Sequence, residues 1–293
     1  MRKLIPMVLT LLLCFSLAAP ALAGVPLHSV HTACVVQDTL YFLRDDIIWS
    51  QAEFAGSPRA ELFLDLKDET AIPFYKHHTT LMSDGETLYL LYPYTGTIFE
   101  VTEAGLVEKL KLDIAGLGEQ RGDIYYTILE DPVMVDGYVY FLVVDPVTYV
   151  DAQLYRFSMT DGQREKMDTA NMSLKQLRPY KDGTILLLNS NDQTVYAFDA
   201  ASGKLGDAVT VLPDVNDGMV TYDAERDKLY YLNDRYLMVC GVPDTYLDHG
   251  PDDGGWLSSY AAMWHGELLV LTDGQLYVAC ASYDPVPVGS LRQ

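Results

Sequence analysis

Residues 182–202 read DGTILLLNSNDQTVYAFDAAS, and this stretch decides the fold. Asp182 and Gly183 have the composition of a tight turn, and the four residues that follow Thr184 are all apolar. A strand that is apolar on successive residues must be covered on both faces. A polar loop at 189–193 then leads to a second apolar segment and a Ser202-Gly203 turn. The stretch therefore predicts a hairpin whose first strand is packed between two other layers.

The same pattern recurs along the chain. Doubly apolar runs stand at 40–43, 88–92, 139–144, 185–188, 229–232 and 268–271. Each run follows turn-like or polar residues and precedes a second apolar or alternating run, and successive runs begin 39 to 51 residues apart. Weaker strands usually flank these two runs, which makes about four short strands per repeat. A period of this length is typical of radial β architectures.

In period and strand pattern the sequence resembles the β-propeller superfamily over nearly all of the chain after residue 23. The resemblance implies an all-β fold, a β-propeller with six blades of about four antiparallel strands each. No WD, kelch or calcium-binding repeat signature accompanies the pattern, so it indicates no particular family. In architecture it is also similar to the N-terminal propeller region of some bacterial secreted solute-binding proteins.

Two alternatives to this architecture stay open. One is a stacked β-sandwich, although sandwiches rarely repeat at this length. The other is a seventh blade, or a chain that is a fragment of a larger protein. For six blades, we expect the ring to close by pairing strands from the two ends of the chain, residues 31–36 and 285–291.

The first 23 residues predict export. Arg2 and Lys3 are basic, residues 4–19 are apolar, and Ala21-Leu22-Ala23 forms an A-x-A cleavage pattern. We therefore expect a signal peptide over 1–23, cleavage after Ala23, and a propeller domain over 24–293 that is secreted or held in the cell envelope. An uncleaved anchor is the alternative. Low cysteine use in an exported chain favours a bacterial source.

The charge excludes two classes of partner. The net charge is −21, and it becomes −23 when Arg2 and Lys3 are removed with the signal peptide. A protein this acidic repels nucleic acid and anionic membrane surfaces, so neither is an expected partner. No later segment approaches the roughly 18 consecutive apolar residues of a membrane span.

Loop lengths predict a ligand site on one face. In a propeller, the loops between second and third strands emerge on the same face as the connections between blades, and such loops commonly carry function. The long loops at 115–124 and 145–152 fall on this face, beside residues 92–96 of the neighbouring blade. The candidate ligand-binding residues on these loops are Tyr92, Tyr94, Arg121, Asp123 and Tyr149.

Aromatic side chains with polar neighbours suit a glycan, peptide or protein ligand. The alternative interpretation is that Arg121 merely neutralises the charge of Glu119 or Asp123. The sequence thus favours an extracellular binding or interaction module, by itself or as the propeller part of a larger surface or solute-binding protein.

No catalytic residues can be assigned. The sequence contains no G-x-S-x-G elbow, H-E-x-x-H helix, P-loop or dinucleotide fingerprint, and no ligand spacing predicts a metal or other cofactor. A propeller enzyme that acts on polysaccharide or peptide through convergent carboxylates is the rival hypothesis. With 41 acidic residues, the sequence leaves that alternative open.

Overall fold

Six four-stranded antiparallel sheets make up the part of the chain that the computed structural model describes. The described residues are 30–52, 60–122, 124–126, 128–144, 152–212, 219–233, 236–239, 246–249, 258–272, 275–279 and 286–287. Each sheet is built from four consecutive strands, paired in the order of the sequence. The predicted all-β architecture of six blades is confirmed for these residues.

The first three blades occupy the first half of the chain. Blade 1 contains β1 (Val30–Val36), β2 (Thr39–Arg44), β3 (Ile47–Gln51) and β4 (Glu61–Asp65). Blade 2 contains β5 (Thr80–Ser83), β6 (Leu88–Tyr92), β7 (Thr97–Thr102) and β8 (Gly105–Lys111). Blade 3 contains β11 (Ile128–Val135), β12 (Tyr138–Val144), β13 (Gln153–Ser158) and β14 (Arg164–Lys166). Between blades 2 and 3, β9 (Glu119–Arg121) and β10 (Ile124–Tyr126) form a separate two-stranded hairpin.

The second half repeats the pattern. Blade 4 contains β15 (Leu174–Pro179), β16 (Thr184–Asn189), β17 (Thr194–Asp199) and β18 (Lys204–Val211). Blade 5 contains β19 (Met219–Asp223), β20 (Lys228–Asn233), β21 (Tyr236–Val239) and β22 (Tyr246–His249). Blade 6 contains β23 (Ser258–Trp264), β24 (Glu267–Thr272), β25 (Gln275–Ala279) and β26 (Val286–Pro287). The helices in the described ranges, η1 (Lys76–His78) and η2 (Lys181–Gly183), are single short turns, and none there could cross a membrane.

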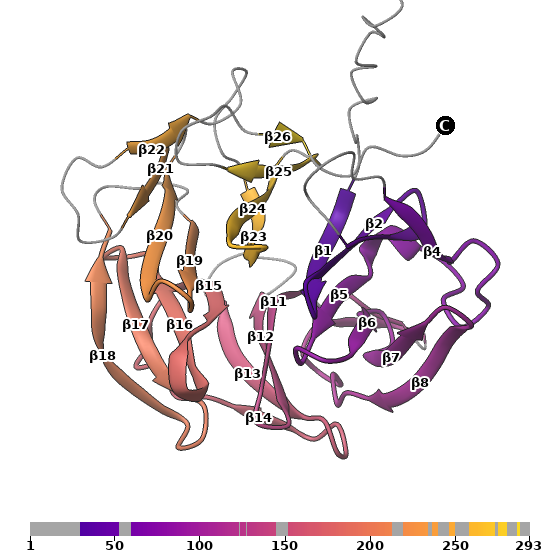
Figure 1. Cartoon of the computed structure of the whole chain (residues 1–293). Coiled ribbons are helices and arrows are strands. Elements are labelled where there is room, and N and C mark those ends of the chain that lie inside the picture. Colours follow the sequence, from indigo (N-terminus) through magenta and orange to yellow (C-terminus); the bar gives the residue numbers. More distant parts are fainter. Residues whose placement is uncertain are drawn as a thin grey trace, which may run out of the picture.

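The first strand of every blade lies nearest the centre of the ring. Figure 1 shows β1, β5, β11, β15, β19 and β23 around the middle and the fourth strands at the outside. Each inner strand contacts the inner strands of the blades before and after it, and β1 also contacts β23. The six inner strands therefore surround the axis of the propeller.

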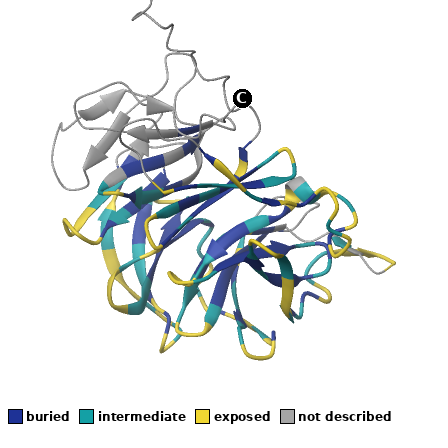
Figure 2. Cartoon of the chain, turned by 45° about the vertical axis from the view of Figure 1, so that its right-hand side comes forward, coloured by how far each residue is buried: buried dark blue, intermediate teal, exposed yellow. Residues whose placement is uncertain are grey.

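Packing on both faces explains the doubly apolar runs. On β16, Ile185 and Leu187 belong to the same core cluster as Tyr140 of blade 3. Leu186 and Leu188 point the other way, into a cluster shared with blade 5. All four of these β16 side chains are buried, and Figure 2 shows buried residues running along strands in the interior of the described part of the molecule. Alternation of side chains along a strand thus fastens each blade to both of its neighbours.

Each inner strand has one edge that pairs with no other strand among the described residues. Side chains of the neighbouring blade accept hydrogen bonds from some of the backbone N–H groups on this edge. Thr32 Oγ1 accepts a hydrogen bond from the Leu81 N–H (3.1 Å), across blades 1 and 2. Gln176 Oε1 accepts one from the Val220 N–H (2.7 Å), across blades 4 and 5. Asp131 makes the corresponding bond between blades 3 and 4. These bonds matter because a buried backbone N–H without a partner is costly.

Among the described residues, blades 1 and 6 meet by packing. Residues 31–36 pair within blade 1 and residues 286–287 pair with β25, and the rest of the segment 285–291, which was expected to pair with 31–36, lies outside the described residues. Blade 1 takes all four strands from the N-terminal side and blade 6 all four from the C-terminal side. Trp264 of β23 is almost fully buried in a cluster with blade 1, and its Nε1–H donates to the Asp38 carbonyl (2.8 Å). Apolar packing with a few hydrogen bonds therefore joins the two ends of the ring.

The packing generates a stability prediction. Leu187→Ala should lower the free energy of unfolding by about 2–5 kcal/mol, because it leaves a cavity between two blades. Leu187→Asp should prevent folding, because the charge would have no partner there. Val211→Ala is the matched control: Val211 is 64% exposed on β18, and its truncation should change stability by less than about 0.5 kcal/mol. Equal urea-unfolding midpoints for Leu187→Ala and the wild type would contradict the blade assignment.

Candidate functional site

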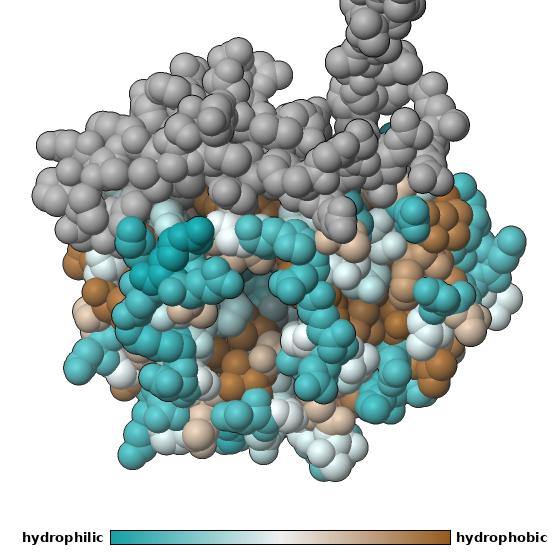
Figure 3. Space-filling model, in the orientation of Figure 1, coloured by the Kyte–Doolittle hydropathy of each residue, from teal (hydrophilic) through white to brown (hydrophobic). Residues whose placement is uncertain are grey.

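The six inner strands line a cavity of about 940 Å³ on the propeller axis. Ligand pockets for small molecules typically measure about 300–1,000 Å³, so the volume suits a small organic molecule or a short polymer segment. Figure 3 shows a recess on one face of the molecule, where apolar atoms lie inside a largely hydrophilic rim.

Thioethers make up much of the apolar wall. Met82, Met134, Met219 and Met263 line the cavity, and they come from β5, β11, β19 and β23 respectively. Met82 and Met219 are buried, whereas the other two are half-buried. Methionine side chains are flexible and polarizable, so such a wall can adapt to apolar groups of different shape.

A bulge in β11 carries the most distinctive polar group of the cavity. Glu130 pairs with Leu142 and Val133 with Tyr140, so Asp131 and Pro132 together face one residue of β12. Asp131 has a positive φ of 51°, as bulges often require. Pro132 has no N–H to offer, and an inner strand tolerates it because its other edge faces the cavity rather than another strand.

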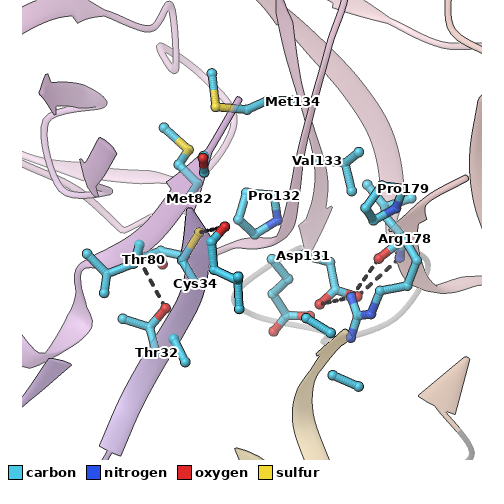
Figure 4. A pocket seen from close by; sticks show the side chains of 18 of the residues that line it. Thr32, Cys34, Thr80, Met82, Asp131, Pro132, Val133, Met134, Arg178 and Pro179 are labelled. Carbon is cyan, nitrogen blue, oxygen red and sulfur yellow. Dashed lines mark hydrogen bonds and ion pairs between the residues drawn. The ribbon is translucent and has the colours of Figure 1, made fainter. Parts of the chain in front are cut away.

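The bulge directs Asp131 across to blade 4. Its Oδ2 accepts a hydrogen bond from the Leu177 N–H (3.1 Å), and its Oδ1 lies 3.0 Å from Nη1 of Arg178. Figure 4 shows this ion pair among the side chains that line the cavity. Arg178 is only 7% exposed, so the pair is largely removed from bulk water.

Only one corner of the Arg178 guanidinium is satisfied. Nη1 donates to the Leu177 carbonyl (2.6 Å) as well as contacting Asp131. Nε and Nη2 are both buried, and neither has a hydrogen-bond partner among the residues that the structure describes. A buried donor left unsatisfied costs about 1–3 kcal/mol, and more when the group is charged. The cavity wall thus holds two adjacent donors of a cationic group that lack an acceptor.

Other titratable groups of the cavity differ in their pKa. Glu130 is exposed to the cavity, but desolvation by the surrounding walls, and then the negative charge of Asp131, raise the pKa of its carboxyl above the usual value. Burial would raise the pKa of Asp84 too, but hydrogen bonds from two backbone N–H groups and the Tyr89 hydroxyl outweigh it, so that pKa is lowered. Burial raises the pKa of the Cys34 thiol to about 12, which makes its thiolate form negligible near neutral pH.

The raised pKa of Glu130 predicts a pH-dependent stability. The unfolded carboxyl has a pKa of about 4.3, so between this value and the higher native pKa the native state binds more protons. Stability therefore falls as the pH rises through that range. Glu130→Gln should unfold at higher urea concentration than the wild type at pH 7, and the advantage should vanish below about pH 4.

The control for this prediction is Glu119→Gln. Hydrogen bonding to Arg121 lowers the pKa of Glu119, so removing this carboxyl should bring no gain at pH 7. Parallel pH profiles for Glu130→Gln and the wild type would show that Glu130 does not carry the effect.

On the predicted loop face, the structure brings two of the three segments together. The Tyr125 N–H donates to the Tyr94 carbonyl (2.9 Å), so the β9–β10 hairpin contacts the turn at 92–96. Asp123, Tyr149 and the third segment, 145–151, lie outside the described residues. Arg121 is exposed and ion-paired with Glu119 (2.9 Å), the contact of the alternative interpretation.

Tyr92 and Tyr94 are both buried beneath this face. The Tyr92 hydroxyl donates to the Phe74 carbonyl (3.2 Å), and burial raises its pKa to about 12. The Tyr94 hydroxyl is hydrogen bonded to Nδ1 of His78. Their role in ligand binding remains a prediction, but the exposed aromatic surface here belongs to another residue.

That residue is Tyr75, in the connection between blades 1 and 2. It is 50% exposed, has a positive φ of 51°, and stacks on the His78 ring with centroids 5.6 Å apart. The Lys76 ammonium donates to three carbonyls of the same connection, those of Leu66, Lys67 and Glu69, and so holds it in place. Tyr75 was not among the predicted residues because they were chosen from unusually long loops, and the segment before η1 did not stand out by its length.

Asp131 and Arg178 were also missed. The available signal was a charged residue inside a strand segment, together with an Asp-Pro pair that predicts a bulge.

Comparison with solved structures finds many propellers of similar fold. A gluconolactonase, XC5397 from Xanthomonas campestris, matches with a TM-score of 0.57 and 15% identity, over 90% of this chain and 91% of that one. Virginiamycin B lyase from Staphylococcus aureus with quinupristin matches with a TM-score of 0.52 and 10% identity, over 89% and 84% of the two chains. YCF48 bound to D1 peptide matches with a TM-score of 0.51 and 10% identity, over 86% and 78%.

No protein-family model matches the sequence, and the search of curated proteins finds no match. The similar structures include enzymes and a protein bound to a peptide, at identities where likeness extends to the fold alone. The chain is therefore an all-β propeller with blades of four antiparallel strands, similar in structure to the six-bladed lyase and gluconolactonase propellers.

Proposed function

We propose that the chain is an extracellular binding module whose central cavity takes up a small organic ligand, such as a short peptide or glycan segment. The observation that carries the proposal is the cavity itself, whose lining combines thioethers from four blades with an incompletely satisfied guanidinium from blade 4. A pocket with an apolar lining and a few directed polar groups is the usual form of a ligand site.

Two of the three carboxyl groups of the described cavity lining support a binding role over a catalytic one. Asp131 accepts from the Leu177 N–H and pairs with Arg178. Asp84 accepts from the backbone of its own turn, at the N–H groups of Glu86 and Thr87. Both carboxylates therefore have structural partners, whereas acid–base catalysis needs carboxylates poised toward a substrate.

The experiment is a saturation-transfer NMR screen of saccharides, short peptides and organic acids. Ala262→Trp should abolish binding, because half-buried Ala262 lines the cavity and an indole would fill part of it. Ala208→Trp, on the exposed face of β18, is the matched control and should bind normally. Ligands that bind both variants and the wild type equally would remove the cavity from the proposal.

The loop face of blades 2 and 3 is a second candidate location, favoured by the exposed Tyr75 ring stacked on His78. Such rings offer flat apolar surface to a sugar or peptide, and Tyr92, Tyr94, Arg121, Asp123 and Tyr149 are the residues predicted around it. A Tyr75→Ala variant in the same screen separates the two locations. Loss of binding in Tyr75→Ala with retention in Ala262→Trp would assign the ligand to this face.

An enzyme acting on polysaccharide or peptide is the rival function, and the raised pKa of Glu130 favours it. A carboxyl that holds its proton to higher pH can serve as a general acid. Hydrolysis of a peptide or polysaccharide by the wild type and its loss in Glu130→Gln would replace the binding proposal with this one.

Export is the other part of the proposal. Residues 1–23 have the three regions of a signal peptide, and we expect cleavage after Ala23. Intact mass spectrometry of the protein recovered outside the cytoplasm should give a chain that begins at Gly24. A recovered chain that retains residues 1–23 would contradict the cleavage and favour an anchor.

A further inference from the structure

We propose that the Nε–Nη2 edge of Arg178 binds the carboxylate of a small organic acid with an apolar body, inside the central cavity. The inference rests on the proposed function and specifies the chemical class of the ligand. It begins from the two donors described above, which are buried in the wall of the cavity without an acceptor.

The geometry of the guanidinium selects the shape of the missing acceptor. Nε–H and one Nη2–H lie parallel along one edge of the group, and this edge matches the two oxygens of a planar carboxylate. Nη1, at the other end, is already engaged by Asp131 and the Leu177 carbonyl. Asp131 therefore fixes one end of Arg178. The other edge is closed to water in this structure, so a carboxylate reaches it only when the groups that cover it move.

Charge selects a monoanion. Three carboxyl groups line the cavity, those of Asp84, Glu130 and Asp131, and Lys175 is the other residue of the described lining, besides Arg178, that is cationic by type. A phosphate dianion would meet stronger repulsion from these carboxyl groups than a single carboxylate would. The low exposure of Arg178, 7%, strengthens the attraction for one negative charge because little water screens it.

The apolar walls select the rest of the ligand. Four methionines from four different blades line the same cavity, and they provide adaptable apolar surface rather than directed polar contacts. An acid whose body is hydrocarbon-rich satisfies both walls at once, whereas a fully polar acid leaves the thioethers uncovered.

The test uses two matched pairs of probes: N-acetyl-leucine with N-acetyl-leucinamide, and N-acetyl-phenylalanine with its amide. Within a pair, only the carboxylate differs. We expect the acids to bind the wild type at least tenfold more tightly than the amides by isothermal titration. In NMR spectra, the Arg178 Nε–H resonance is identified by its absence from the spectrum of Arg178→Lys. We expect the acids, and not the amides, to shift this resonance in the wild type.

Arg178→Lys keeps the charge that pairs with Asp131 but removes the two-donor edge, so it should weaken acid binding at least tenfold and leave amide binding unchanged. Arg164→Lys, on the outer strand β14 of blade 3, is the matched control and should bind the acids as the wild type does. If Arg178→Lys does not fold, the neutral double variant Arg178→Gln/Asp131→Asn replaces it, with the same expected loss.

Three results overturn the inference, and they also separate it from the proposed function. Acids that bind Arg178→Lys as tightly as the wild type remove Arg178 from recognition. Acids and amides that bind alike, and fail to bind Ala262→Trp, leave the cavity as a ligand site without a carboxylate contact. A wild type that binds no probe in the cavity and shows no shift of the Arg178 resonance removes the carboxylate site altogether.

Discussion

The structure depends on a strand that is apolar on both faces. A strand such as β16 cannot leave either side to water, so each second strand needs a blade before it and a blade after it. A row of blades with this requirement ends with two uncovered faces unless it bends into a ring. Burial of Trp264 against blade 1 removes that last exposed face. The ring and its axial cavity thus follow from a local property of the sequence.

The ring in turn sets the chemistry of its axis. Inner strands converge there with unpaired edges, so polar side chains and prolines appear at positions that an ordinary central strand would exclude. Thr32 and Gln176 use their side chains to serve the N–H groups of the next blade. Asp131 does the same and also holds a guanidinium, which brings a buried cation into a strongly acidic protein. Structural need and the proposed recognition are combined in one residue pair.

The fold could be predicted from sequence because burial of alternate residues leaves a direct trace in residue type. Ile185 to Leu188 are apolar in the sequence and buried in the structure for one reason. The candidate site could not be predicted in the same way, because the position of a residue in a loop does not reveal which other side chains cover it. Tyr94 was expected on a ligand-binding face, yet His78, from a connection sixteen residues earlier, bonds its hydroxyl and buries it. Likewise, nothing near Arg178 in the sequence indicates that Asp131, in another blade, would occupy only one of its corners.

The seam between blades 6 and 1 has a kinetic consequence. Neighbouring blades are joined by bonds between residues 49, 46 and 44 positions apart, whereas the Trp264–Asp38 bond spans 226 positions. Chain-closure entropy grows with the logarithm of loop length, so forming the seam costs only about 1.4 kcal/mol more than forming one blade-to-blade contact from a flexible chain. Short-range folding can therefore build an open arc of blades before the ends meet. Blades 1 and 6 share no strand among the described residues, and they are the first and last blades in chain order. We therefore expect the ring to open first at this seam while the remaining interfaces stay intact.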